Sequence, residues 1–295
     1  MDIRDYSGQE LLERLDSGKL SVLDAIGAHD LKKEMIHVGR LCSFVVRLVC
    51  LNNDDSTLRK KAAGVIRFAA PAKLLGKLPV CGDTIVLGFN HPSLGEVCRL
   101  LYLGFLRYPD RKFLFPVNLP WYESMVPVIP KLERLGIRIS PMITPATEAK
   151  LNRRFEGDEK KLKDVQYLKM LFDRKYIRGI KAISEQNGVI FVAPSATRQK
   201  EIIGDPVHPS MTALAHLVHK GDRKALFVPV AVFAPKHGNR ELNLFRSYSI
   251  EPCEPFHTEE VKELISEKDR AFDYAFLRRI EAVYKKRAKK LHLND

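Results

Sequence analysis

The stretch TIVLGFNHPSLGE, residues 84–96, joins a short apolar run to a polar segment in which a new element begins. Thr84–Phe89 has the length and β-branched content of a buried strand, and Pro92 suits the first turn of a following helix. Similar strand-like runs occupy residues 112–116, 137–139, 189–193 and 225–233, and helix-like stretches occupy residues 94–107, 130–135, 158–186 and 211–219. Continuous apolar strands that alternate with helices predict an α/β fold with a mostly parallel central sheet flanked by helices.

The first sixty residues have a different pattern, which is helical throughout. Ser7 and Glu10 have the spacing of a capping box, and Ser21 precedes an acidic residue at the same spacing. We therefore predict two domains, a small N-terminal helical bundle at residues 1–60 and an α/β domain at residues 61–295.

The chain is strongly basic, with 49 Lys and Arg against 36 Asp and Glu among 295 residues, a net charge of +13. Residues 1–60 hold nine basic and ten acidic side chains, so the excess lies in the predicted α/β domain. This excess predicts an anionic partner: nucleic acid, a membrane surface or a phosphorylated small molecule. Composition alone does not choose among the three.

The cysteine content and the N-terminus indicate a cytoplasmic protein. Five scattered cysteines are too few for a disulfide framework, and no apolar signal sequence follows Met1. The most apolar early run, residues 41–51, covers eleven residues and contains Arg47. Because crossing a bilayer takes about 20 apolar residues, we expect no span.

His91 is the first candidate for chemistry, because it directly follows the predicted strand that ends at Phe89. Glu96 lies five residues later, so a turn would bring its carboxylate to one imidazole nitrogen. A histidine held by a carboxylate can act as a general base, since the carboxylate fixes the tautomer and stabilises the imidazolium. Taken alone, the pair is also compatible with a structural histidine.

Two further segments follow or form strands of the predicted sheet. In the segment 192–200, VAPSATRQK, small residues precede Arg198 and Lys200, a composition that suits a loop around an anion, and Thr197 adds a hydroxyl. In VPVAV, residues 228–232, the proline lacks an N–H and so marks a sheet edge, a strand start or a bulge.

Together these three segments resemble the glycerolipid acyltransferase family. Its first block is NHxxxxD, which the chain has at residues 90–96 with Glu96 in the last place. Its third block is commonly PEGTR, and the chain reads PSATR at residues 194–198. The pattern is closest to the soluble plastid-type glycerol-3-phosphate acyltransferases, which also carry an N-terminal helical bundle and lack spanning helices.

The resemblance implies transfer of a fatty acyl group from acyl-CoA or acyl carrier protein to the hydroxyl of glycerol 3-phosphate. It implies no further cofactor and no metal. His91, oriented by Glu96, would be the general base. Basic and hydroxyl side chains would bind the phosphate of the acceptor: Thr197, Arg198, Lys200, Lys150, Arg153 and Arg154.

Two alternatives remain beside this expectation. A lysophosphatidate acyltransferase would use the same base with a bulkier acceptor, and a catalytically silent lipid- or membrane-binding homologue is suggested by the departures at Glu96 and at Ser195. We do not expect a nucleic-acid partner, because the basic residues are not interleaved with aromatic side chains that could stack on bases.

The C-terminal segment, residues 271–291, carries an apolar stripe at helical spacing and a run of basic residues. Such a helix could lie on an anionic membrane surface, which would make the protein soluble or peripherally attached at the cytoplasmic face. It could equally be a terminal helix that packs on the protein. His216 and His219 are spaced to share a helix face, but the sequence offers them no third metal ligand.

Overall fold

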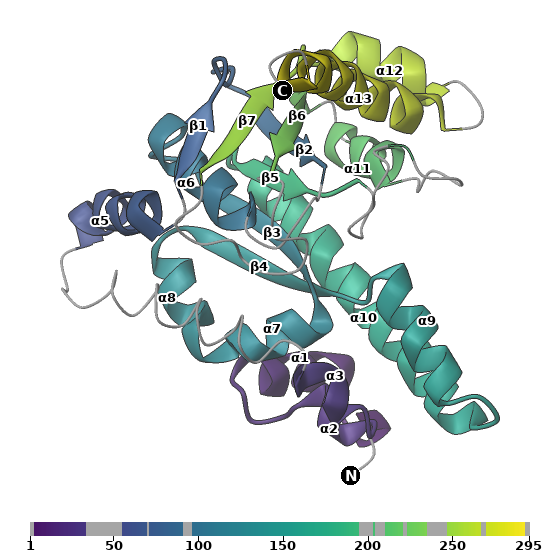
Figure 1. Ribbon diagram of the computed structural model, residues 1–295. Coiled ribbons are helices and arrows are strands. Elements are labelled where there is room, and N and C mark those ends of the chain that lie inside the picture. Colours follow the sequence, from purple (N-terminus) through teal and green to yellow (C-terminus); the bar gives the residue numbers. More distant parts are fainter. Residues whose placement is uncertain are drawn as a thin grey trace. The chain divides into compact units, whose positions relative to one another are not determined.

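A computed structural model describes residues 3–33, 55–69, 71–90, 96–194, 203, 210–220, 223–234, 247–266 and 270–292. It has the predicted α/β fold, in which helices flank a mostly parallel sheet (Figure 1). In spatial order the strands are β1 (Ala72–Leu74), β7 (Tyr248–Pro252), β6 (Ala225–Phe233), β2 (Thr84–Phe89), β5 (Val189–Val192), β3 (Phe113–Asn118) and β4 (Ile137–Met142). Strand β2 pairs in parallel with both β5 and β6, whereas β6 and β7 are antiparallel.

The helices of the described residues precede, separate and follow these strands. In chain order they are α1 (Gly8–Asp16), α2 (Val22–Ala25), α3 (His29–Lys33), α5 (Asp55–Ala69), α6 (Glu96–Arg107), α7 (Leu119–Met125), α8 (Ile129–Arg134), α9 (Pro145–Arg154), α10 (Glu159–Ser184), α11 (Ser210–His219), α12 (Thr258–Ser266) and α13 (Ala271–His292). Short 3-10 turns occupy Ile3–Asp5 and Val126–Val128.

The chain forms two compact units. The first contains residues 1–58 and 114–179, and the second contains residues 59–113 and 180–295. The N-terminal helices thus share a unit with a later part of the chain. The domain boundary that we place at residue 60 stays a prediction.

In the first unit, side-chain caps start the N-terminal helices as the sequence predicts. The Ser7 hydroxyl accepts a hydrogen bond from the backbone N–H of Glu10 at 3.2 Å, which caps α1. Ser21 caps α2 in the same way and also donates to the buried carboxylate of Glu123 at 2.6 Å. Glu123 lies on α7, so this bond ties the start of α2 to a helix about 100 residues further along the chain.

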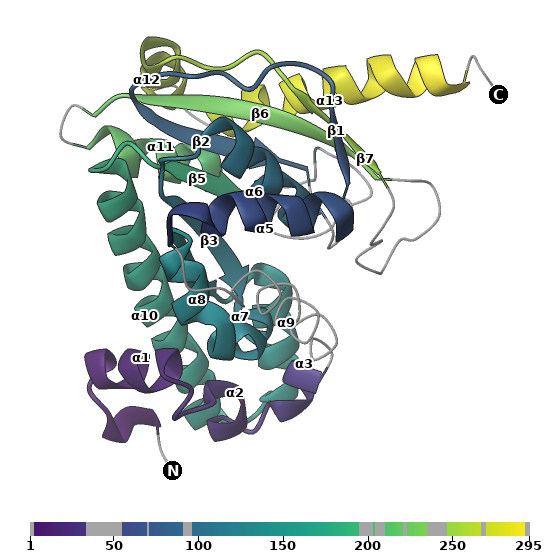
Figure 2. The ribbon, with the colours of Figure 1, turned by 90° about the vertical axis from the view of Figure 1, so that its left-hand side faces the viewer.

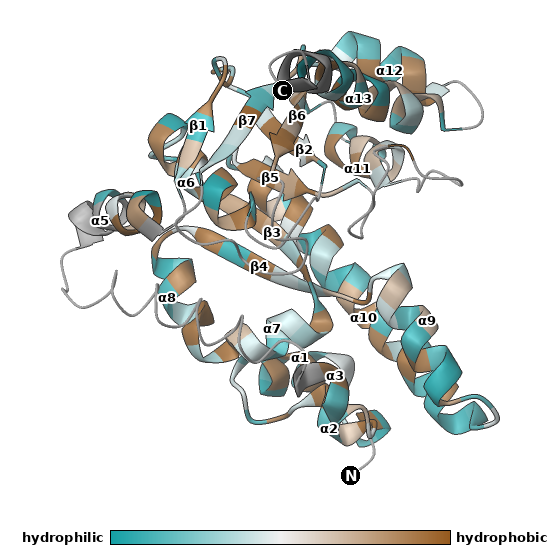
Figure 3. Cartoon of the chain, viewed as in Figure 1, coloured by the Kyte–Doolittle hydropathy of each residue, from teal (hydrophilic) through white to brown (hydrophobic). Residues whose placement is uncertain are grey.

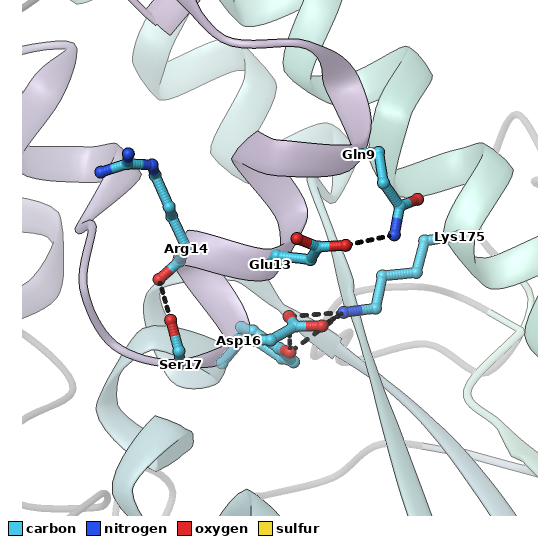
Figure 4. A network of polar contacts seen from close by, with 7 residues as sticks. Gln9, Glu13, Arg14, Asp16, Ser17 and Lys175 are labelled. Atoms are coloured by element: carbon cyan, nitrogen blue, oxygen red, sulfur yellow. Dashed lines mark hydrogen bonds and ion pairs between the residues drawn. The ribbon is translucent and has the colours of Figure 1, made fainter.

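A second polar tie in the first unit joins α1 to α10. Both carboxylate oxygens of Asp16 lie 2.5 Å from the ammonium nitrogen of Lys175 (Figure 4). The hydroxyl of Tyr122 donates to the same carboxylate. Since Tyr122 is buried on α7, three separate segments of the chain meet at one carboxylate.

In the second unit, the helices cover both faces of the strands. Helices α5 and α6 lie on one face and α11 and α13 on the other (Figure 2). Residues of β2 are buried along its whole length, which fits a strand covered from both sides. Figure 3 shows the same distribution, with hydrophobic residues gathered on β2, β5 and β6.

Gly88 allows the close approach of α13 to β2. A Cβ atom added at Gly88 would lie 2.4 Å from the ring of Phe276, a buried residue of α13. Any larger side chain would therefore have to displace the aromatic ring. The absence of a side chain at position 88 lets Phe276 pack directly on the backbone of the central strand.

Pro229 lies where the pairing of β6 with the segment after β7 is interrupted. Of the three positions that the sequence allows for this proline, a sheet edge, a strand start or a bulge, the structure shows the bulge. Phe227 bridges to Phe256, and Val230 pairs with Pro252, so two residues of β6 face three residues of the other segment. The N–H of Cys253 still donates to the Pro229 carbonyl at 2.8 Å. The missing N–H of Pro229 thus falls where the ladder is already irregular.

We expect Gly88→Ala to destabilise the protein by about 1–3 kcal/mol, because the added methyl group overpacks the contact with Phe276. Urea unfolding measures this change. Gly82→Ala is the matched control, since a Cβ at position 82 meets nothing within 4 Å. Equal stability of the two variants would contradict the packing role of Gly88.

Candidate active site

The three segments singled out in the sequence belong to three neighbouring strands of the second unit. Strand β2 lies between β5 and β6 and runs parallel to both. In the register, Gly88 faces Val192 of β5, so Asn90 and Pro194 each lie two residues beyond a paired position. Because parallel strands end at the same edge, Asn90 and Pro194 lie at the same edge of the sheet, at the ends of neighbouring strands.

Asn90, the first residue of the NHxxxxE block, binds the backbone of β6. Its Nδ2 donates to the Val232 carbonyl at 2.9 Å, and its Oδ1 accepts from the Val232 N–H at 2.7 Å. A side-chain amide has the donor and acceptor of a peptide group, so Asn90 adds one more pair to the ladder after Phe89 faces Val230. The Asn90 side chain therefore extends the hydrogen bonding between β2 and β6 beyond the last backbone pair.

Glu96 starts α6, and its side chain is completely buried. Arg99, one turn later on the same helix, is also completely buried. Burial lowers the pKa of Arg99 and outweighs the opposing effect of nearby groups, of which Glu96 is one. His91 lies outside the described residues, so its pairing with Glu96 stays a prediction.

The predicted phosphate-binding residues of the third block, Thr197, Arg198 and Lys200, also lie outside the described residues. The two ends of their segment are described. The hydroxyl of Ser210, the first residue of α11, donates to the carbonyl of Pro194 at 2.9 Å. This bond brings the start of α11 to the end of β5.

Lys150, Arg153 and Arg154, the remaining predicted phosphate ligands, lie on α9 in the first unit. All three are exposed on the surface. Arg154 forms a two-pronged ion pair with Asp30, in which one guanidinium nitrogen lies 2.6 Å from each carboxylate oxygen. A phosphate that engaged Arg154 would have to compete with this carboxylate.

The start of α11 is bound by a buried carboxylate from α13. Asp273 accepts from the backbone N–H of Met211 at 2.7 Å and from that of Thr212 at 3.3 Å. The Thr212 hydroxyl donates to it as well. Asp273 thus satisfies helix N-terminal donors in the way that an N-cap does, although it lies 61 residues further along the chain.

His216 and His219 take up surface and structural positions on α11. His216 is exposed, whereas His219 is partly buried, with Nδ1 at 3.0 Å from the Arg223 carbonyl and its ring against Phe227. Burial lowers the pKa of His219. Within the described residues, no group of three His, Cys, Asp or Glu side chains is arranged to hold a metal ion.

The apolar stripe of the C-terminal helix packs inside the protein. Phe272, Phe276 and Ile280 of α13 are fully buried, and the ring of Phe272 packs edge-on against Phe227 of β6. The stripe therefore serves the core along this part of α13, and its basic residues Arg278 and Lys286 are exposed. In the part of the chain that the structure describes, no helix combines the length and the apolar character needed to cross a bilayer.

Sequence reasoning missed Arg99 and its aromatic partner. The guanidinium carbon of Arg99 lies 3.7 Å from the ring centroid of Tyr248, and its Nε donates to the Pro71 carbonyl at 3.1 Å. A signal was present, because Arg99 is a basic residue within the apolar run 97–105, three residues after Glu96. That spacing places both side chains on one helix face.

Comparison with known proteins adds no assignment. No family model matches the sequence, and no curated protein is significantly similar to it.

We expect Asn90→Ala to lower the free energy of unfolding by about 1–3 kcal/mol, because it leaves the N–H and the carbonyl of Val232 without their partner. Asn90→Asp should also destabilise, since a carboxylate cannot donate to the Val232 carbonyl. Urea denaturation measures both changes. Asn152→Ala, at an exposed position of α9, is the control and should stay within about 0.5 kcal/mol of the wild type.

Proposed function

We propose that the protein transfers a fatty acyl group from acyl-CoA or acyl carrier protein to the hydroxyl of glycerol 3-phosphate. The observation that carries the proposal is the parallel order of β5, β2 and β6, since Asn90 and Pro194, which directly precede the predicted site residues in sequence, lie at one edge of the sheet on neighbouring strands. In α/β proteins this edge is where ligands bind.

The chemistry assigned to His91 is general-base catalysis. His91 takes the proton of the acceptor hydroxyl as its oxygen attacks the carbonyl carbon of the acyl thioester. A tetrahedral intermediate forms and then collapses, the carbon–sulfur bond breaks, and the imidazolium returns the proton to the leaving thiolate. Glu96 stabilises the imidazolium and holds the imidazole in the tautomer that can accept the proton.

Arg198, Lys200 and Thr197 hold the phosphate of the acceptor. Their contribution is orientation, because a bound phosphate places the hydroxyl near the base and raises its effective concentration. Lys150 and Arg153 are proposed as further phosphate contacts. Arg154 is proposed with a smaller contribution, because Asp30 already engages its guanidinium.

We expect His91→Ala to reduce turnover at least about 100-fold, because the hydroxyl then lacks a base. The measurement is transfer of labelled acyl groups from acyl-CoA or acyl carrier protein to glycerol 3-phosphate, with circular dichroism to confirm folding. His216→Ala, an exposed histidine on α11, should behave like the wild type. Substantial turnover by the His91→Ala variant would refute the catalytic role of His91. If the wild type prefers lysophosphatidate to glycerol 3-phosphate, lysophosphatidate is the acceptor.

We expect Arg198→Ala to raise the KM for glycerol 3-phosphate about tenfold with a smaller change in kcat, because a charged hydrogen bond to phosphate is lost. Steady-state kinetics at fixed acyl donor measures this split. Arg174→Ala, an exposed arginine on α10, is the matched control. An unchanged KM would remove Arg198 from the phosphate site.

Attachment to an anionic membrane is proposed through the exposed basic face of α13. Arg278→Glu with Lys286→Glu should weaken binding to anionic vesicles at least about tenfold, since each basic residue near such a surface contributes about 1 kcal/mol. Cosedimentation with anionic and neutral vesicles measures the difference. The control is Lys163→Glu with Arg174→Glu, which changes the net charge by the same amount at exposed positions of α10. If this control loses vesicle binding equally, the effect comes from net charge and not from α13.

A further inference from the structure

The imidazole of His219 holds the C-terminal end of α11 on the start of β6. His219 is the last residue of α11, and its Nδ1 lies 3.0 Å from the carbonyl oxygen of Arg223, two residues before β6 begins. Its ring packs against Phe227 of β6, with 5.9 Å between the ring centroids. One side chain therefore joins the last turn of the helix to the backbone that leads into β6 and to the sheet itself.

The hydrogen bond at Nδ1 decides which nitrogen of the ring carries the proton. A carbonyl oxygen can only accept, so Nδ1 is the donor and the neutral ring presents a bare acceptor at Nε2. This Nε2 atom is buried, and within the described part of the chain nothing hydrogen-bonds to it. Protonation at Nε2 would create a charged N–H donor without an acceptor in a buried position, which is strongly unfavourable.

The groups around the imidazole do not offset this cost. Burial is the largest effect and lowers the pKa of the imidazole below its ordinary value of 6.5, although the bond to the Arg223 carbonyl opposes the change. On α12, Lys262 disfavours a positive ring and Glu259 favours it, and His216 on α11 disfavours it. The guanidinium of Arg223 is engaged in an ion pair with Glu185 at 3.0 Å.

We propose that His219 is a pH-sensitive latch, in which the neutral imidazole holds the last turn of α11 on β6 and protonation releases that turn. The inference goes beyond the proposed function and does not depend on it. A protonated ring must reach water to satisfy Nε2, so it has to leave Phe227 and break its bond to the Arg223 carbonyl. The start of α11 keeps its own bonds to Asp273 and Pro194, so we expect the opening to stay at the end of the helix.

The direction of the pH effect follows from proton binding. Between pH 6.5 and the lowered pKa of the folded protein, the unfolded chain binds a proton at His219 that the folded chain does not bind. The stability is therefore complete above this window and is lost as the pH falls through it. His219→Asn removes the titration and can keep the bond, because the Asn amide N–H takes about the place of the Nδ1–H.

Urea unfolding at about pH 7.5 and about pH 5.5 compares the wild type with His219→Asn. His216→Asn, the same substitution at an exposed position of the same helix, is the matched control. Between the two pH values, the folding equilibrium constant of the wild type and of the control should fall at least about threefold more than that of His219→Asn. An equal fall in all three proteins would overturn the latch.

NMR of the wild type tests the inference without a substitution. The ring of His219 should carry its proton on Nδ1 and should titrate at lower pH than the ring of His216. At about pH 5.5, amide hydrogens in the last turn of α11 should exchange faster in the wild type than in His219→Asn, while those of the first turn exchange alike. Titration of both rings at the same pH, or equal exchange of the last turn in the two proteins, would contradict the proposal.

Discussion

The parallel pairing of β2 with β5 on one side and β6 on the other is the constraint on which the rest of the second unit depends. The pairing fixes which ends of the strands share an edge, and the register of Gly88 with Val192 fixes where each chain segment departs. At Asn90 the side-chain amide, and not the backbone, forms the hydrogen bonds to β6. Its two bonds to Val232 replace a further backbone pair between the strands. Segments that are about a hundred residues apart in sequence thereby start from adjacent positions.

The close packing of α13 on this sheet depends on small features of the sequence. Gly88 leaves room for the ring of Phe276, and Asp273 binds the first turn of α11 from the same helix. The C-terminal helix therefore both covers one face of the central strand and fixes the helix that follows β5. A substitution in the apolar stripe of α13 would therefore disturb both the packing on β2 and the contact with the start of α11, because both contacts come from the same helix.

The strong local patterns predicted much of the fold. The bounds of β2 and β6 agree with the apolar runs at residues 84–89 and 225–233, because fully buried strands are apolar along their whole length. β1 and β7 escaped prediction. Both strands are short, since β1 covers three residues and β7 ends at Pro252. Neither is long enough to show the alternation of apolar and polar residues by which a strand is recognised in sequence. Their existence depends on pairing between distant segments, which local sequence does not encode.

The candidate site was predicted from short motifs, and such motifs identify residue types but not what surrounds them. Glu96 was found by its spacing from His91, but the motif does not indicate that Glu96 is completely buried, or that Arg99 on the same helix is buried against Pro71 and Tyr248. The apolar stripe of α13 is a similar case. Periodicity shows that one face of a helix meets an apolar surface, but not whether that surface is lipid or protein, and here the strands and α11 supply it.

The same contacts fix the described ends of both motif segments. Asn90, the last described residue before the first segment, is bound to β6, and Glu96, the first described residue after it, is completely buried. Pro194, the last described residue before the second segment, is bound by Ser210, and the first turn of α11 is bound by Asp273. A site that must bring a base and a phosphate-binding group together gains most from such anchoring at the segment ends, because orientation is what the scaffold supplies to catalysis.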